Sequence, residues 1–230
     1  MKTIGLIGGI SWESTAVYYR LLNEMTRDRL GGFSSAQVLL HSINFAELEP
    51  HQVAGDWDAA AEIMVDAARR LEQGGAECLL IGANTMHLVA PQVASAVAIP
   101  VLHIVDATGR ALADAGVKSP LLLATRYTME KPFYREKLKQ DYGIEPMIPG
   151  DADRDEVHRV IYEELCQGVI CDSSRESYLE IIKKSVADGA DGVIFGCTEV
   201  GLLLSVDDPP VPAFDTTGLH AQMALDFALN

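Results

Sequence analysis

The sequence of 230 residues predicts an α/β fold with two pseudo-symmetric, three-layer α/β/α lobes, mainly parallel sheets and an active-site cleft between the lobes. Three observations lead to this prediction. Short apolar runs alternate with amphipathic stretches along the whole chain. The apolar runs are continuous, as is typical of parallel strands that helices cover on both faces. A segment that begins at Ala76 is also echoed by one that begins at Ala190.

The first half of the chain carries clear helix signals. Ser11 is a suitable N-cap for a stretch whose apolar residues recur at helical spacing, and Gly31 and Gly32 suit its C-terminal end. Asp56 is a similar cap for the next helix, which Gly74 closes. We therefore expect strands over residues 3–8, 36–44, 77–83 and 100–105, and helices over residues 11–32 and 56–75.

The same alternation of apolar runs and amphipathic stretches continues to the end of the chain. Continuous apolar runs predict further strands, and the amphipathic stretches between them predict helices. We expect strands over residues 119–125, 144–148, 191–197 and 210–214, and helices over Lys131–Tyr142, Arg154–Gln167 and Arg175–Ala187.

The two echoing segments match in detail. The first reads AECLLIGANTMH from Ala76, and the second reads ADGVIFGCTEVG from Ala190. Both continue through a helix and a proline-containing strand to an Asp-x-Thr stretch, at Asp106 and at Asp215. An approximate two-fold repeat explains these matches. It predicts an N-terminal lobe at residues 1–103 plus 215–230 and a C-terminal lobe at residues 104–214.

The composition excludes several classes of partner. The net charge is −15, from 33 acidic and 18 basic residues, and such a surface repels the phosphates of nucleic acids. We find neither a signal peptide nor an apolar run long enough to cross a membrane, so we expect a cytoplasmic protein. The four cysteines show no paired CxxC spacing, so we expect no metal site.

Four short stretches follow predicted strands, where open parallel sheets bind their ligands: GGIS at 8–11, ANT at 83–85, ATRYT at 124–128 and CTE at 197–199. Their backbone N–H groups and helix dipoles would hold an anion such as a carboxylate and would favour the thiolate of Cys197, whereas a close approach of the Glu199 charge would oppose it. Simpler interpretations stay open, because Cys197 can be a core thiol and Asn84 and Thr85 can cap a helix. The chain has no GxGxxG motif and no P-loop lysine, so we expect no nucleotide cofactor.

Five stretches spread over essentially the whole chain form a more specific combination. They are IGLIGGISWESTAVYYRLLN, GANTMH, ATRYTME, IYEEL and GCTEV. In their order and spacing they resemble the aspartate/glutamate racemase family. The resemblance implies an isomerase, a homodimeric amino-acid racemase that needs neither pyridoxal phosphate nor another cofactor. It implies a small amino acid or dicarboxylate as the ligand.

The resemblance also implies roles for individual residues. Family members place one thiol from each lobe on opposite faces of the substrate Cα, so that a proton leaves from one face and returns to the other. Cys197 matches the second thiol, whereas Ala83 stands where the family usually carries the first. The remaining candidates are expected to bind the substrate: Ser11, Gln52, Asn84, Thr85, Thr125, Thr198 and Glu199.

Three explanations of Ala83 stay open. The residue can be an engineered substitution, which the intact Asn84 and Thr85 favour and which predicts a racemase impaired as written. The chain can be a natural relative with one base, whose second proton comes from water. It can also perform a one-sided reaction, such as decarboxylation of a malonate-like diacid with Cys197 as the proton donor. A catalytically silent amino-acid binding protein is the further alternative.

The substrate preference follows less directly. The stretch after the second predicted strand reads NFAELEPHQVAG, which we interpret as a loop. It contains no arginine or lysine to hold a distal carboxylate, and its long polar donors are His51 and Gln52. This departure weakens the case for a strict aspartate preference and leaves room for glutamate or neutral amino acids.

Overall fold

The computed structural model describes residues 1–230, which divide into two compact units. Unit 1 comprises Met1–Ile104 and His220–Asn230, and unit 2 comprises Val105–Leu219. The C-terminal boundary thus lies after Leu219, later than the Phe214 that the repeat suggested. The reason is that Ala213–Asp215 forms a strand of the second sheet, so the residues that follow it stay with that unit.

Unit 1 is built on a parallel sheet whose central strand is β1 (Ile4–Gly8). On one side of it lies β2 (Val38–Ser42), and on the other lies β3 (Cys78–Ile81). Val101 adds a single parallel bridge to Leu79 of β3. The strand predicted over residues 100–105 is therefore wrong beyond this bridge, because Ile104 already begins a helix.

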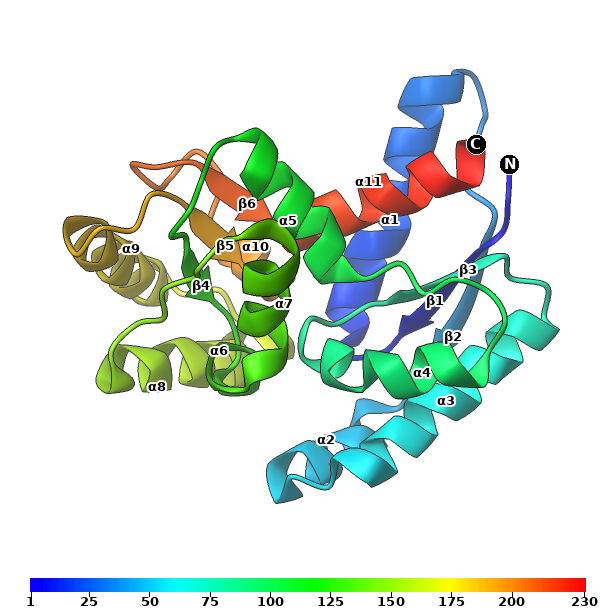
Figure 1. The fold of residues 1–230 in the computed structure, drawn as a ribbon, viewed down its shortest axis with the longest axis horizontal. Helices are drawn as coiled ribbons and strands as arrows, with labels where there is room; N and C mark the ends of the chain where they lie inside the picture. The colour runs from blue at the N-terminus through cyan, green and yellow to red at the C-terminus, as the bar shows by residue number, and fades with distance from the viewer. The chain divides into compact units, whose positions relative to one another are not determined.

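Helices cover both faces of the sheet in unit 1 (Figure 1). Successive side chains of β3 point to opposite faces, so Leu79 belongs to one core and Leu80 to the other. The first core is closed by the helices of residues 45–96, and the second by the helices nearest the two termini. These elements are α1 (Trp12–Leu30), α2 (Phe45–Ala54), α3 (Trp57–Gln73), the 3₁₀ turn η1 (Thr85–Val89), α4 (Ala90–Ala96) and α11 (Thr216–Leu229).

Unit 2 repeats the parallel sheet with shorter strands. Its order is β4 (Leu121–Leu123), β5 (Val193–Phe195) and β6 (Ala213–Asp215), and Met147 adds a bridge to Leu121. The strand predicted over residues 144–148 is reduced to that bridge. The helical elements are α5 (Ile104–Asp114), α6 (Arg126–Glu130), α7 (Pro132–Tyr142), α8 (Asp151–Arg159), the π turn η2 (Val160–Glu164), the 3₁₀ turn η3 (Leu165–Gln167), α9 (Asp172–Ala187) and α10 (Val200–Leu203).

The internal repeat is visible in the sheet topology. Each half of the chain has four strand positions, one of which is a single bridge. They are β1, β2, β3 and Val101 in unit 1, and β4, Met147, β5 and β6 in unit 2. In each unit the first position lies between the second and the third, and the fourth pairs with the third. The helix after the fourth position is exchanged between the halves. Most of α5 belongs to unit 2, whereas most of α11 belongs to unit 1. The predicted class, two parallel-sheet α/β lobes with helices on both sides, is confirmed.

Two other expectations about secondary structure need correction. The stretch NFAELEPHQVAG is not a loop, since α2 occupies most of it, with Asn44 as its N-cap. The helix predicted over Arg154–Gln167 exists but changes from α to π to 3₁₀ geometry along its length. None of the helices in the chain combines the length with the apolar composition that a bilayer span requires.

The turn after β1 depends on Gly9. Its φ of +84° lies in the left-handed region, and a Cβ at this position would run into the backbone oxygen of Ile43. Gly55 has a similar φ of +71°, but open space surrounds the position where its Cβ would stand. A side chain would therefore strain the backbone at either glycine, but only at Gly9 would its Cβ also clash with another part of the chain.

Replacing Gly9 by Ala should lower the free energy of unfolding of unit 1 by roughly 2–4 kcal/mol, because strain and a backbone clash add. Gly55→Ala should cost only about 1 kcal/mol. Both tryptophans lie in unit 1, so denaturant unfolding followed by their fluorescence reports on this unit. Equal losses in the two variants would contradict the assigned clash.

Candidate functional site

The four predicted strand-end stretches follow β1 and β3 in unit 1 and β4 and β5 in unit 2. In each unit the two strands are hydrogen-bonded neighbours that run parallel. Their carboxyl ends therefore meet at one edge of the sheet, where ligands of open α/β sheets bind. Each unit thus brings its own pair of candidate turns together.

The turn after β1 is held by two hydroxyl groups. Thr15 Oγ1 accepts a hydrogen bond from the N–H of Gly9 at 2.7 Å and donates to the carbonyl of Ser11 at 3.0 Å. Ser11 Oγ accepts from the N–H of Ser14 at 3.3 Å, which confirms Ser11 as the N-cap of α1. Because Ser11 is buried and already caps a helix, its binding role stays a prediction.

The turn after β3 carries Ala83, Asn84 and Thr85. Ala83 is partly exposed, whereas Asn84 and Thr85 are buried. The interpretation of Asn84 as a simple helix cap is wrong, since its side chain makes no capping hydrogen bond to η1. Gln52 reaches this turn from α2, with its Nε2 3.1 Å from the sulfur of Met86.

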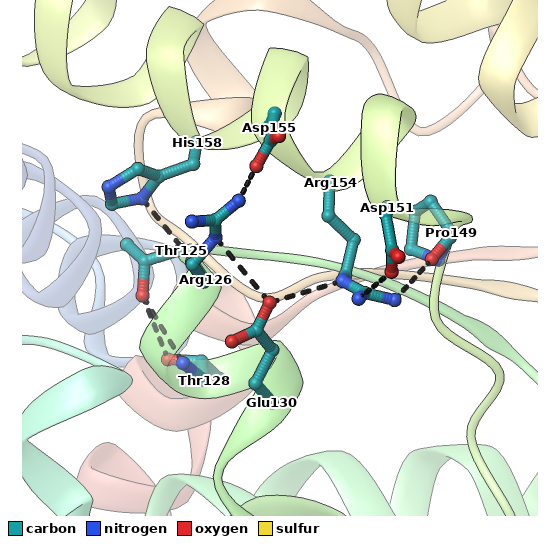
Figure 2. Close-up of polar contacts among 9 residues, drawn as sticks. All are labelled: Thr125, Arg126, Thr128, Glu130, Pro149, Asp151, Arg154, Asp155 and His158. Carbon is teal, nitrogen blue, oxygen red and sulfur yellow. Dashed lines mark hydrogen bonds and ion pairs between the residues drawn. The ribbon is translucent and has the colours of Figure 1, made fainter.

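The turn after β4 is braced from α8 (Figure 2). Thr125 caps α6, since its Oγ1 accepts from the N–H of Thr128 at 3.3 Å. The N–H of Arg126 donates to Nδ1 of His158 at 3.3 Å, and the Arg126 guanidinium pairs with Glu130 at 3.4 Å and with Asp155. Burial, followed by the charge of Arg126, lowers the pKa of His158, which suits its role as an acceptor.

Arg126 is a further candidate residue, which the sequence reasoning did not single out. It directly follows Thr125 and supplies a cation at a strand end, the feature missing from residues 44–55. The stretch ATRYT already contained the signal. Only the structure shows that Arg126 forms ion pairs with Asp155 and with Glu130, which also pairs with Arg154.

The turn after β5 holds the thiol in contact with a carboxylate. Cys197 Sγ donates to Oε2 of Glu199 at 2.8 Å, and Cys166 Sγ lies 3.8 Å from Oε1 of the same group. Glu199 is only 3% exposed. Burial and then the charge of Glu199 raise the pKa of Cys197 well above its ordinary value.

Burial and the contact with Glu199 therefore outweigh the helix field, which by itself would favour the thiolate of Cys197. The helix that follows, α10, has only four residues and begins after Glu199. Its field is short, whereas the carboxylate lies in direct contact with the sulfur. Cys197 consequently rests as a protonated thiol.

Thr198 is tied to the second Asp-x-Thr stretch. Thr217 Oγ1 donates to Thr198 Oγ1 at 2.8 Å, and the N–H of Thr217 donates to Oδ1 of Asp215 at 3.0 Å. Burial raises the pKa of Asp215. Sequence reasoning noticed the Asp-Thr-Thr echo but did not connect it to the CTE turn. It missed Cys166 entirely, because no motif marks that residue.

The structure contains no group of three His, Cys, Asp or Glu side chains that could hold a metal ion. The polar groups at the strand ends are backbone N–H groups, hydroxyls, amides and the Cys197–Glu199 pair. These groups can hold a carboxylate and transfer a proton.

Comparisons with known proteins identify the family of the chain. Residues 7–224 match the family described as Asp/Glu/Hydantoin racemase. A crystal structure of a candidate Asp/Glu racemase from Yersinia pestis is 49% identical, with a TM-score of 0.92 and full coverage of both chains. An aspartate racemase homologue from Pyrococcus horikoshii is 35% identical, with a TM-score of 0.86 and full coverage of both chains.

A third relative is the broad specificity amino-acid racemase RacX of Bacillus subtilis. It is 20% identical over 174 residues, which are 73% of this chain and 71% of the relative. The family match spans nearly the whole sequence and includes all four strand-end turns. This chain therefore belongs to the Asp/Glu/hydantoin racemase family.

Proposed function

We propose that this protein is an amino-acid racemase that acts on aspartate or glutamate without pyridoxal phosphate and is impaired by Ala83. The observation that carries the proposal is the Cys197–Glu199 pair at the end of β5, in a chain of the racemase family. The pair places a thiol in direct contact with a carboxylate that can accept its proton. We further propose a cytoplasmic homodimer.

The proposed proton transfer has two steps. Glu199 takes the thiol proton of Cys197, and the thiolate then removes the Cα proton of the substrate, which leaves the electron pair on Cα. The substrate carboxylate delocalises this charge, and N–H groups at the end of β5, near Thr198, stabilise it. Ser11, Gln52 and Thr125 contribute further polar groups at the strand ends.

The return of a proton to the other face explains the expected impairment. Racemisation needs a second acid–base group, and the methyl group of Ala83 can neither accept nor donate a proton. Water must then supply the proton, so removal of the Cα proton outpaces inversion. A thiol or hydroxyl group at position 83 would supply the second acid–base group.

The substrate range follows from the charges near the turns. Arg126 is a cation at a strand end, but its guanidinium already forms ion pairs with Glu130 and Asp155. Gln52 offers an uncharged amide. This polarity suits a distal carboxylate without requiring it, so we propose activity on both aspartate and glutamate.

A second candidate function is a lyase that decarboxylates a malonate-like diacid. The protonated state of Cys197 and the methyl group of Ala83 favour it, because such a reaction needs one proton donor. The bond between Cα and one carboxylate breaks, CO2 leaves, and the electron pair on Cα takes the proton of Cys197. Solvent then returns a proton to the thiolate.

Replacing Ala83 by Cys should raise the rate of inversion of L-Asp and L-Glu by about 10²–10⁴, the usual contribution of an acid–base group. Chiral chromatography of the product measures it. Ala94→Cys, at an exposed position of α4, is the matched control and should change nothing. If Ala83→Cys gives no gain while the unmodified protein releases CO2 from a diacid, the lyase is the correct function.

Cys197→Ser should reduce exchange of the substrate Cα proton in D2O by at least about 10². The hydroxyl is a far weaker acid than the thiol, so the thiolate step is lost. Cys171→Ser makes the same change at a partly exposed thiol and should leave exchange intact. Proton NMR of the substrate follows the exchange. Persistent exchange in Cys197→Ser would assign the proton transfer to another residue.

Glu199→Gln should lower the pKa of Cys197, because it removes the negative charge that opposes the thiolate. Alkylation of Cys197 by iodoacetamide at mildly alkaline pH should become faster, as mass spectrometry of the labelled peptides would show. Cys78 is an internal reference, because burial raises its pKa to about 11 and it should stay unlabelled. Slower alkylation in Glu199→Gln would contradict the assigned contact.

A further inference from the structure

His87 lies in the core of unit 1, four residues after Ala83. Its side chain is only 1% exposed. It touches two segments that are far apart in the sequence, the turn after β3 and the start of α5. A buried histidine with two polar contacts is held in one orientation and one protonation state, so both contacts can be assigned.

The first contact compensates for the geometry of η1. In an α-helix the N–H of His87 would donate to the carbonyl of Ala83, four residues earlier. In the 3₁₀ turn it donates to the carbonyl of Asn84 instead, at 3.0 Å. The carbonyl of Ala83 instead accepts a hydrogen bond from Nδ1 of the His87 imidazole at 2.9 Å. The side chain thus takes the place of the missing backbone donor.

The second contact follows from the first. A carbonyl only accepts, so Nδ1 of His87 carries the proton, and Nε2 of the neutral ring is an acceptor. Nε2 accepts the N–H of Ile104 at 3.2 Å. Ile104 is the first residue of α5, and the first N–H groups of a helix lack partners within it.

The surroundings keep the ring neutral. The His103 ring lies 4.6 Å from it and the His220 ring 5.6 Å, centroid to centroid. His220 is itself engaged, since its Nε2 donates to the carbonyl of Leu102 at 2.7 Å and its Nδ1 lies 2.8 Å from the hydroxyl oxygen of Tyr18. Burial, then His103 and His220, lower the pKa of His87 well below its ordinary value.

We infer that His87 is a positioning residue, whose neutral imidazole with the proton on Nδ1 fastens the backbone of residue 83 to the start of α5. The inference rests on the proposed function in one respect, because residue 83 is the position assigned to the second acid–base group. The imidazole sets the backbone from which any side chain at position 83 projects. It does not exchange protons with the substrate.

Two substitutions separate the two contacts. Asn at position 87 can replace Nδ1 as the donor to Ala83 but cannot reach Ile104, whereas Gln can replace Nε2 as the acceptor. We expect the amide of Ile104 to exchange with D2O about tenfold faster in His87→Asn and within about threefold of the unchanged rate in His87→Gln. His41→Asn, on the edge strand β2, is the matched control and should leave Ile104 unaffected.

Nitrogen NMR of the imidazole gives an independent readout in the unmodified protein. We expect the proton on Nδ1 of His87 at neutral pH. A proton on Nε2, a charged ring at neutral pH, or unchanged Ile104 exchange in His87→Asn would each overturn the inference. These measurements need no turnover, so they stand even if the proposed racemase activity is absent.

The activity readout uses the Ala83→Cys background. There His87→Gln should lower kcat for inversion by about ten- to a hundredfold with little change in KM, because the thiol introduced at position 83 would be displaced while the substrate still binds. His87→Asn should retain more of kcat than His87→Gln. The reverse order would overturn the inference. Absence of inversion in Ala83→Cys itself would count against the proposed function and not against the role of His87.

Discussion

Each sheet has to be covered on both faces, and neither half of the sequence does this alone. The helix after the fourth strand position belongs mainly to the other unit, so α11 completes unit 1 and α5 belongs to unit 2. In α11, Ala221, Ala224 and Ala228 pack against the β1 and β3 side chains of the second core. Small residues allow this close approach. The exchange explains why the unit boundaries fall inside α5 and α11.

Because the helices are exchanged, the chain passes between the units at two segments, and the backbone groups there need hydrogen-bond partners. Leu102 and Ile104 precede one passage, and His220 follows the other. His220 holds the carbonyl of Leu102, and His87 holds the N–H of Ile104. Buried polar backbone groups need partners, and an imidazole nitrogen supplies one in each case, a donor from His220 and an acceptor from His87. The core of unit 1 and the turn after β3 are thereby linked.

The two related turns differ in chemistry as well as in sequence. After β5, burial and then the charge of Glu199 keep Cys197 protonated. After β3, the corresponding residue Ala83 has no titratable group, and the turn is held by His87. Electrostatics dominates the first turn and backbone geometry the second. The two turns that the repeat relates are thus stabilised by different interactions.

The sequence by itself determined the α/β class, most strands and helices and the repeat, because continuous apolar runs and capped amphipathic stretches are local signals. It also located Cys197, Ala83 and their neighbours at strand ends. The tertiary structure decided the rest. The direction of the Cys197 pKa shift depends on the burial of its sulfur and on how close Glu199 comes. The roles of His87, Arg126 and Cys166 depend on partners 17 to 33 residues away. Such contacts leave no periodic trace in a sequence, since only the folded chain brings the partners together.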